Sequence, residues 1–439
     1  MNRSIWVVVG FFVFSICLSH LAFGQAASVS ADVSQTRSIL VTQFGTKADS
    51  LTDDTAAIQK ALDAAGKAGG GEVFLPAGKY RIEGSLTVPS GVTLRGVWEA
   101  PHHSDQSWGS ALWVVAGRGQ EDGPPAVELR PSSTIRGVTI FYPEQSIDDI
   151  QPYPWAIRGA GMNCSVLDVT LVAAYQGINF GYKHHELHVI RNVYGCVLRR
   201  GFFIDQCTDI GRIEDVHINP HYWARADAPN APKEGGNWNK LADYVNNNLE
   251  VFIFARSDWE YVFNTFAWGF KICYKFVQAG HGGCNGNFLG IGADGGQYAL
   301  WVEHTQTPGL LITNGEFVTF AGDSPIELVT TETFKGVVQL TNCSFWGPTR
   351  SCAELRGPGF VSFQQCNFCD WSKEDYAIRA ISGDVIISDS RFGANKPHIL
   401  LDGDLSSAII KGNRFRGPLQ FDNKSDAQVE MGLNIADKP

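Results

Sequence analysis

Several features that would place this chain in a common functional class are missing from its sequence. After residue 18 no apolar stretch is long enough to span a bilayer, and a formal net charge of −10 disfavours nucleic-acid binding. No dense acidic cluster indicates a Ca²⁺ site, and no helical 3.6-residue pattern runs along the second half. We therefore expect no membrane-spanning segment in the mature chain, no nucleic-acid partner and no helical-repeat fold.

The first residues have the pattern of a secretory signal peptide. Arg3 supplies a positive charge, an apolar stretch runs over residues 5–18, and Ala22-Phe23-Gly24 is a small-x-small cleavage site. We expect residues 1–24 to be removed and the mature protein to be secreted or periplasmic.

The second half of the chain repeats at steps of 28, 23, 24 and 23 residues. The repeated unit is an apolar residue, a variable residue, a small polar residue or Gly, two further residues and Phe. The Phe positions are Phe317, Phe345, Phe368, Phe392 and Phe415, and the third places hold Asn314, Asn342, Gln365, Asp389 and Gly412. Such short, β-rich units with a fixed period predict an all-β parallel β-helix, in which each coil buries its apolar side on the next.

The same rhythm extends toward the N-terminus. Val138, Val169, Val193 and Val216 step by 31, 24 and 23 residues, so Asp215 matches Asp168 and Asn192. This register predicts a turn or ladder hydrogen bond for these polar residues, and no catalytic role.

Residues 41–96 combine a helix signal with short strands. Asp53-Asp54-Thr55 precedes a helix expected from about Thr55 to Ala68, and Gly69-Gly70-Gly71 ends it. A short helix can cover the open first coil of a solenoid.

The motifs FGTKADSLTDDTAAIQKAL, GGGEVFLPAGKY and VTLRG in this segment closely resemble the N-terminal part of the pectate-lyase-like superfamily, with its rhamnogalacturonase- and epimerase-like proteins. The resemblance implies a right-handed, single-stranded parallel β-helix with an N-terminal capping helix, and work on polysaccharide. It does not select a reaction. We expect one domain over residues 25–439.

Two stretches interrupt the repeats and are expected to be insertions on one face. Residues 97–125 are rich in Trp and His, and residues 221–257 include aromatic residues and a helix expected from Asn239 to Asn247. Their aromatic side chains either bind ligand or pack the insertions themselves.

A second short strand follows each coil segment, and its outward residues are expected to form a working face. Aligning residues 176–181, 200–206, 268–273 and 298–303 gives outward stripes that mix cations, carboxylates and rings, which suit binding of an acidic sugar chain. The substrate-binding candidates are Arg200, Trp223, Arg225, Trp268, Lys271, Tyr298 and Trp301. A slip of one residue would turn these side chains inward.

Glycoside hydrolysis needs two carboxylates, one able to donate a proton. The catalytic candidates are Asp205, Asp258, Asp294 and Glu303, with Asp294 paired to Glu303 or Asp258. Polygalacturonase-like enzymes carry Asn-Thr-Asp, Asp-Asp, Gly-His-Gly and Arg-Ile-Lys signatures, of which only Gly280-His281-Gly282 is present, so their catalytic roles are not transferred.

A lyase acting on a uronate would use a cation and a base, for which Arg200, His221, Arg225 and Lys271 are candidates. A lyase could use Ca²⁺, with Asp205 among its ligands; no other cofactor is implied. A non-catalytic polysaccharide-binding β-helix is the third possibility.

Two motifs resemble metal sites. In His184-His185-Glu186-Leu187-His188 a metal would be bound by His184 and His188, but a strand-rich region does not give the i, i+4 geometry of a helix, and a structural role is favoured. Cys366-x-x-Cys369 lacks a second pair and is interpreted as core.

After Cys17 in the signal peptide, nine cysteines remain, an odd number that cannot fully pair. Cys343 and Cys366 occupy equivalent places in adjacent coils, and we favour a thiol ladder over a disulfide.

From these residues we expect a secreted enzyme that cleaves glycosidic bonds in a polysaccharide by carboxylate acid/base hydrolysis. The cationic stripes predict that this polysaccharide is acidic. A lyase is the first alternative. Oligomeric state is left open.

Overall fold

A computed structural model of the chain describes residues 38–98, 108–228 and 230–438. The expected signal peptide, residues 1–24, lies outside this range. No helix in these ranges is long and apolar enough to cross a membrane.

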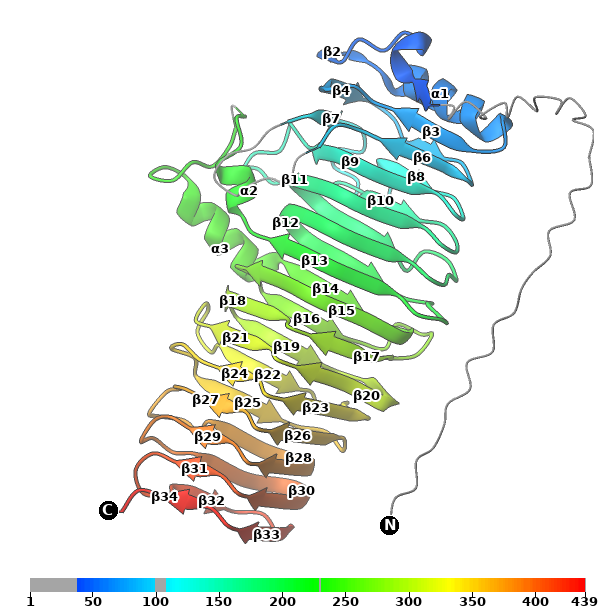
Figure 1. Cartoon of the computed structure of the whole chain (residues 1–439). Helices are drawn as coiled ribbons and strands as arrows, with labels where there is room; N and C mark the ends of the chain where they lie inside the picture. Colours follow the sequence, from blue (N-terminus) through cyan, green and yellow to red (C-terminus); the bar gives the residue numbers. More distant parts are fainter. Residues whose placement is uncertain (1–37, 99–107, 229, 439) are drawn as a thin grey trace, which may run out of the picture. The chain divides into compact units, whose positions relative to one another are not determined.

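The described strands pair in parallel throughout and stack into a parallel β-helix (Figure 1). The strands of successive coils pair to form three parallel sheets. We number them 1, 2 and 3 in the order in which the chain passes through them within most coils. Several strands bend from one sheet into the next.

Sheet 1 consists of β5 (Leu86–Val88), β8 (Val127–Leu129), β10 (Trp155–Gly159), the ends of β11 (Ser165–Phe180) and β12 (Val189–Ile204), β14 (Glu250–Phe254), β16 (Ile272–Phe276), β19 (Tyr298–Val302), β22 (Ile326–Thr330), β25 (Ser351–Leu355), the starts of β28 (Ile378–Ser388) and β30 (Ile399–Lys411), and β32 (Phe421–Asn423).

Sheet 2 consists of β1 (Ser38–Leu40), β3 (Gly71–Phe74), β6 (Val92–Arg95), the starts of β9 (Thr134–Phe141), β11, β12, β13 (Arg212–Ile218) and β15 (Ser257–Trp268), then β17 (Cys284–Leu289), β20 (Thr305–Thr313), β23 (Val337–Thr341), β26 (Phe360–Gln364), the ends of β28 and β30, and β33 (Gln428–Gly432).

Sheet 3 consists of β2 (Asp49–Asp53), β4 (Gly78–Ile82), β7 (Ser110–Val114), the ends of β9, β13 and β15, the middle of β11 and β12, then β18 (Gly292–Gly296), β21 (Glu316–Thr319), β24 (Ser344–Phe345), β27 (Asn367–Phe368), β29 (Arg391–Phe392), β31 (Arg414–Phe415) and β34 (Ile435–Ala436).

The polar third place of each repeat makes the sharp turn from sheet 2 to sheet 3. These residues have positive φ, for example +55° at Asp168 and +53° at Asn192, a backbone conformation that Asn, Asp and Gly adopt most readily. Asn192 Nδ2 donates to Asp168 Oδ1 at 2.9 Å, and Asn264 Nδ2 donates to Asp215 Oδ1 at 2.7 Å. The predicted turn ladder is confirmed.

The repeated Phe side chains form a stack inside the sheet 3 side of the coils. The ring centroids of Phe345 and Phe368 are 5.1 Å apart, and those of Phe368, Phe392 and Phe415 follow at steps of 4.7 Å. All are buried, so the period seen in the sequence is the period of the core.

Three α-helices lie outside the described coils. The predicted first helix is present as α1 (Thr55–Lys67), next to the short 3₁₀ helix η1 (Val41–Phe44), and it packs on β3, β5 and β6; its capping role stays a prediction. The helices α2 (His221–Ala224) and α3 (Trp238–Asn248) lie on the flank where sheet 3 runs, in green in Figure 1.

Part of each expected insertion belongs to the β-helix. β14 pairs with β12 and β16, and β7 pairs with β4 and β9, so residues 250–254 and 110–114 are coil strands. The short β14, directly after α3, had been absorbed into the expected insertion 221–257, and the predicted working face lost one coil.

Separately from that omission, the predicted strand at 268–273 was placed four residues too early. Ile272, and not Trp268, pairs with Tyr298, and Lys275, and not Lys271, pairs with Trp301. Trp268 ends β15 in sheet 3, and Lys271 lies in the loop before β16. The register over β11, β12 and β19 is as predicted.

All nine cysteines in the described residues are free thiols. Cys343 and Cys366 are stacked neighbours without a bond, as the predicted thiol ladder requires.

Candidate functional site

A groove of about 240 Å³ lies on the outer surface of sheet 3, on the side of the helix that carries α3. It spans the coils of β15, β18 and β21. Its lining includes Phe266, Asp294, Glu316, Val318 and Trp346.

Asp294 occupies an outward position of β18 beside Trp268 of β15. Burial raises the pKa of its carboxyl above the usual value, because the charged form loses solvation. Its carboxylate makes no hydrogen bond or ion pair with any residue in the described ranges. Its proton is therefore retained to higher pH than that of a solvated aspartate, as a general acid requires.

Glu316 opens β21, one coil further on. It is exposed, pairs with Gly292 of β18, and lies two residues along and one coil away from Asp294. With coils about 4.8 Å apart and a rise of about 3.3 Å per residue, the two positions are roughly 8 Å apart. Within the described residues this carboxylate also makes no ion pair.

Sequence reasoning missed Glu316, because it lies inside the repeated segment that had been assigned to the core. The usable signal was alternation: the residue before each core Phe must point outward.

Aromatic side chains continue from this groove toward the α2–α3 insertion. The His221 ring stacks on Trp238 with centroids 4.1 Å apart, and Trp238 stacks on Trp268 at 5.7 Å. Trp346 and Phe320 on the other side are exposed. Flat apolar rings of this kind present surfaces on which sugar rings can stack.

The predicted carboxylate pairs are not formed. Asp294 faces outward from sheet 3, whereas Glu303 directly follows β19 of sheet 1, where it accepts a hydrogen bond from Trp301 Nε1 at 3.0 Å. Asp258 lies at the start of β15 in sheet 2, where it is held by Arg256 and by Gln306. Different sheets of the coil hold the three residues, so neither predicted partner lies beside Asp294.

Asp205 has an unexpected partner. His281, of the Gly-His-Gly motif, brings Nδ1 to 2.9 Å from Asp205 Oδ2, and the backbone N–H of Arg256 donates to Asp205 Oδ1. Asp205 is buried and His281 is half exposed. This Asp–His pair lies at the turn from sheet 1 to sheet 2, away from the groove.

The predicted substrate-binding residues are scattered. Trp223 is fully buried in α2, which contradicts its expected role as a substrate contact. Arg225 is bound to Glu234 at 2.5 Å, and Glu234 also lies 3.0 Å from His221.

Arg200, Tyr298 and Trp301 do lie outward on sheet 1. Arg200 approaches Glu121 at 3.6 Å, and the Tyr298 and Trp301 rings meet at 4.9 Å. Sheet 1 is therefore a polar and aromatic surface, as expected, although its charged groups are paired with one another.

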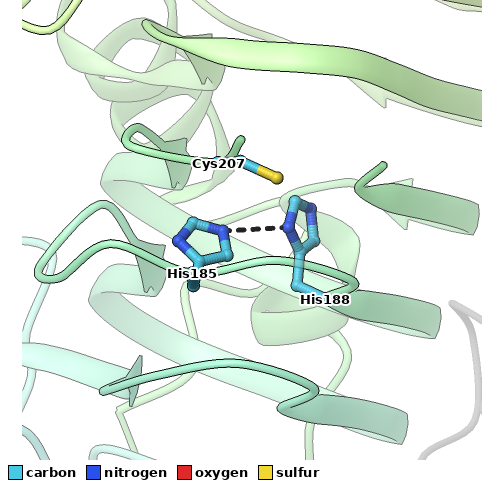
Figure 2. A group of neighbouring side chains, drawn as sticks. All are labelled: His185, His188 and Cys207. Atoms are coloured by element: carbon cyan, nitrogen blue, oxygen red, sulfur yellow. Dashed lines mark hydrogen bonds between the residues drawn. The ribbon is translucent and has the colours of Figure 1, made fainter. Parts of the chain in front are cut away.

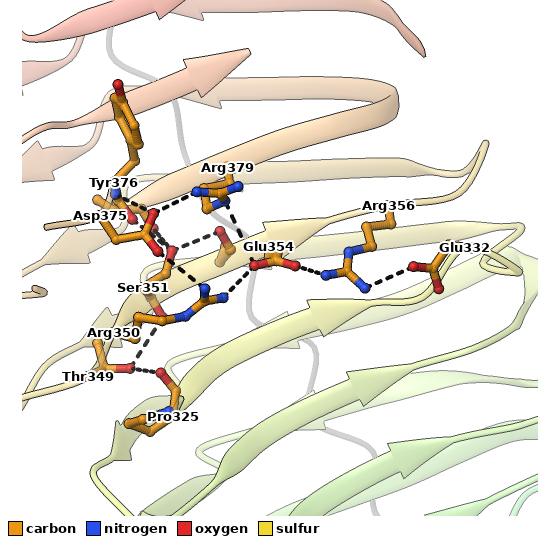
Figure 3. Close-up of polar contacts among 12 residues, drawn as sticks. Pro325, Glu332, Thr349, Arg350, Ser351, Glu354, Arg356, Asp375, Tyr376 and Arg379 are labelled. Carbon is orange, nitrogen blue, oxygen red and sulfur yellow. Dashed lines mark hydrogen bonds and ion pairs between the residues drawn. The ribbon is translucent and has the colours of Figure 1, made fainter. Parts of the chain in front are cut away.

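Further along sheet 1, a buried carboxylate holds three arginines together (Figure 3). Glu354 bonds to Arg350 and Arg356 and lies 3.8 Å from Arg379 Nε, while Asp375 accepts from Arg379 at 2.9 Å. The mutual pairing of these groups indicates a structural network.

The described residues contain one group with the donor atoms of a transition-metal site, formed by His185, His188 and Cys207. His184 is not part of this group: its Nε2 lies 2.7 Å from Thr208 Oγ1, so the disfavoured pairing of His184 with His188 on one metal is not formed.

Comparison with known proteins supports the fold. The family model "Rhamnogalacturonase A/epimerase, pectate lyase-like" matches residues 38–118. Alginate lyase 7 of Azotobacter vinelandii is 54% identical over 54 residues, which is 12% of this chain and only 6% of that protein.

Two solved structures extend the likeness over most of the chain. The A-module of mannuronan C-5 epimerase AlgE6 from Azotobacter vinelandii has a TM-score of 0.51 at 16% identity, covering 91% of this chain and 100% of that one. A GH87 α-1,3-glucanase from Streptomyces thermodiastaticus has a TM-score of 0.53 at 13% identity, covering 92% and 70%.

The predicted resemblance is confirmed: the chain is a parallel β-helix whose residues 38–118 match the pectate-lyase-like family model. By name these proteins are a lyase, an epimerase and a glucanase, and the match to the curated relative is confined to a short segment of both chains.

Proposed function

We propose that this protein is an exported glycoside hydrolase that binds a polysaccharide along sheet 3 and cleaves it in the groove of Asp294 and Glu316. The observation that carries the proposal is the presence of two carboxylates in one groove, with no partner among the described residues and in unequal environments. Elsewhere the carboxylates named above are held by cations or other donors.

The roles follow from the two environments. Asp294 is half buried and its raised pKa suits protonation of the leaving-group oxygen. Glu316 is exposed, so its carboxylate can reach a water molecule to activate it, or attack the anomeric carbon. A separation of roughly 8 Å between positions is compatible with either stereochemical course, since side-chain torsions set the final distance.

The substrate has to suit the groove. The residues that line it include no Lys or Arg, so a neutral sugar chain fits it better than the acidic polymer suggested by the misaligned stripes of sheet 1. Phe266 and Trp346 in its wall, with Trp268 beside Asp294, would stack on successive sugar rings.

The test is a screen of the purified mature chain on neutral and acidic polysaccharides, following reducing ends and ultraviolet absorbance together. We expect new reducing ends without absorbance, and a loss of at least about a hundredfold in kcat for Asp294→Asn and for Glu316→Gln. Glu430→Gln, an exposed carboxamide variant on the last coils, is the matched control and should keep full activity.

Full activity in both groove variants would refute the assignment of this site. Reducing ends accompanied by absorbance would identify β-elimination instead and refute the hydrolase.

A lyase or epimerase acting on a uronate is the second candidate, and one contact favours it. His217 Nδ1 lies 2.9 Å from the hydroxyl of the buried Tyr222, which would orient the partly exposed His217 ring as a base for proton abstraction next to a carboxylate. Alginate as substrate in the screen, with His217→Gln as the variant, tests this candidate directly.

A further inference from the structure

Three metal-binding side chains meet inside the turns that join sheet 1 to sheet 2 (Figure 2). His185 and His188 lie in the turn between β11 and β12, and Cys207 lies one coil further on, between β12 and β13. The backbones of His185 and Cys207 form a parallel bridge. All three side chains are buried, and their donor atoms lie within 4.8 Å of one another.

The outer nitrogen of each imidazole faces an acceptor. His185 Nδ1 is 3.1 Å from the carbonyl oxygen of Lys183, and His188 Nε2 is 3.1 Å from Glu260 Oε1. The Lys183 carbonyl has no proton to donate, and as a carboxylate Glu260 accepts at both oxygens, from His188 at Oε1 and from Ser257 at Oε2. The hydrogen-bond network therefore assigns the N–H group to the outer nitrogen of both rings.

The other ring nitrogen of each histidine, which carries a lone pair, then points toward that of its neighbour. His185 Nε2 and His188 Nδ1 are 3.0 Å apart, and Figure 2 shows the two rings edge to edge with the Cys207 sulfur above them. Two lone pairs at this distance repel unless a cation lies between or beside them. This cation is either an additional proton on one ring or a metal ion that both rings bind.

The third donor favours a metal. Cys207 Sγ lies 3.8 Å from the carbonyl oxygen of Asp209, and its thiol also hydrogen-bonds with His188, so the sulfur faces the two imidazoles. Two imidazole nitrogens and a thiolate form a donor set typical of Zn²⁺, and the Glu260–His188 contact is the carboxylate–histidine arrangement that orients zinc ligands.

Charge balance agrees with this identity. The site is buried, with the Phe180 ring stacked on His188 at 5.2 Å. One Zn²⁺ ion with the Cys207 thiolate and the Glu260 carboxylate sums to zero, so the ion would enter an apolar region without a net charge. Tetrahedral zinc places donors about 3.3 to 3.6 Å apart. The two nitrogens, now 3.0 Å apart, would separate by a few tenths of an ångström, and the sulfur, within 4.8 Å of them, would move closer by up to about 1 Å.

We propose that His185, His188 and Cys207 bind a Zn²⁺ ion that ties two successive coils together beneath the turn surface. Three protein donors leave a fourth position for water. Binding converts the Cys207 thiol to a thiolate and releases its proton to solvent. The ion has a structural role, because its three ligands are buried in the turns between sheets 1 and 2 and none of them lines the groove on sheet 3.

The first test is the metal content of the purified full-length mature protein, produced with zinc in the medium and dialysed. We expect one zinc per chain by mass spectrometry of the elements. Protein produced with cobalt should show two spectroscopic signals. One is a thiolate-to-metal charge-transfer band in the near ultraviolet, and the other is the set of visible bands typical of tetrahedral Co²⁺. Wild-type protein without bound zinc, or a cobalt form without a thiolate band, would overturn the proposal.

The second test compares two buried cysteines. Cys207→Ala should lower zinc occupancy at least about tenfold, whereas Cys196→Ala, which removes an equally buried thiol from the core near sheet 3, should keep it. A strong chelator should lower the melting temperature of the wild type and of Cys196→Ala. Equal zinc loss in both variants would refute the assignment, and if Cys207→Ala does not fold, the wild-type metal content and cobalt spectrum still decide.

Discussion

Removal of one ring from the Phe stack should destabilise the β-helix strongly, and Phe392→Ala is the sharpest case. Phe392 is 1% exposed and lies between Phe368 and Phe415, with ring centroids 4.7 Å away on both sides and planes inclined by 24° and 20°. It therefore loses contacts on two neighbouring coils when truncated.

The magnitude follows from two contributions. Truncation of a buried Phe to Ala costs about 3 to 5 kcal/mol, a range that includes the cavity left behind. Each offset-stacked ring pair is worth about 0.5 to 1.5 kcal/mol beyond its burial, which places this doubly stacked position at the upper end, near 5 kcal/mol. Phe392→Leu keeps most of the volume and loses the ring pairs, so we expect about 2 kcal/mol.

The assay is urea denaturation combined with hydrogen exchange. In a solenoid each coil contacts only its neighbours, so the faster exchange of Phe392→Ala should concentrate in β27, β29 and β31 and leave β11 and β12 unchanged. Leu51→Ala, at a side chain that is 80% exposed, is the control and should match the wild type. If Phe392→Ala unfolds at the urea concentration of this control, the stack does not carry the stability argued here.

Two buried carboxylates give further predictions. Glu327 is fully buried, both its oxygens lack a hydrogen bond, and burial raises its pKa well above the usual value. Below the pKa near 4.5 of the unfolded chain, the neutral Glu327 carboxyl favours folding, and this contribution is lost as pH rises toward the higher pKa of the folded protein. Glu327→Gln should therefore stabilise the protein at pH 7 and not at pH 4, as measured by urea denaturation. A gain that is equal at both pH values would contradict this ionisation argument. Glu354→Gln leaves three arginines without their shared partner and should cost about 3 to 5 kcal/mol, whereas the exposed Glu332→Gln should melt like the wild type; equal melting of the two would show that the network is not stabilising.

Much of the architecture could be predicted because the residues of each coil in a solenoid specify the length and the turns of that coil. The spacing of Phe317 to Phe415 and the polar residues at each third place predicted the coil period, the turns and the ladder, and the structure confirms each of them. The helix α1 was also predicted within one residue at its C-terminal end.

The site was predicted less well, since its register depends on counting coils. The five-residue strand β14 carries almost no polar alternation, with Val251, Phe252, Ile253 and Phe254 all buried, and it follows directly on a helix. Nothing in the local pattern separated it from the insertion, so the predicted face lost this coil. Trp268 and Lys271 were misplaced because the next strand was taken four residues too early, at 268–273, and not at Ile272–Phe276.

The sequence by itself determined the repeat, the turn chemistry and the class of fold, because each depends on residues within one coil and its equivalents in the next. Only the tertiary structure decided which side chains meet. Asp294 and Glu316 come to one groove, and His188 reaches Glu260 across 72 residues, because stacking brings equivalent positions of successive coils to about 4.8 Å whatever length of chain lies between them.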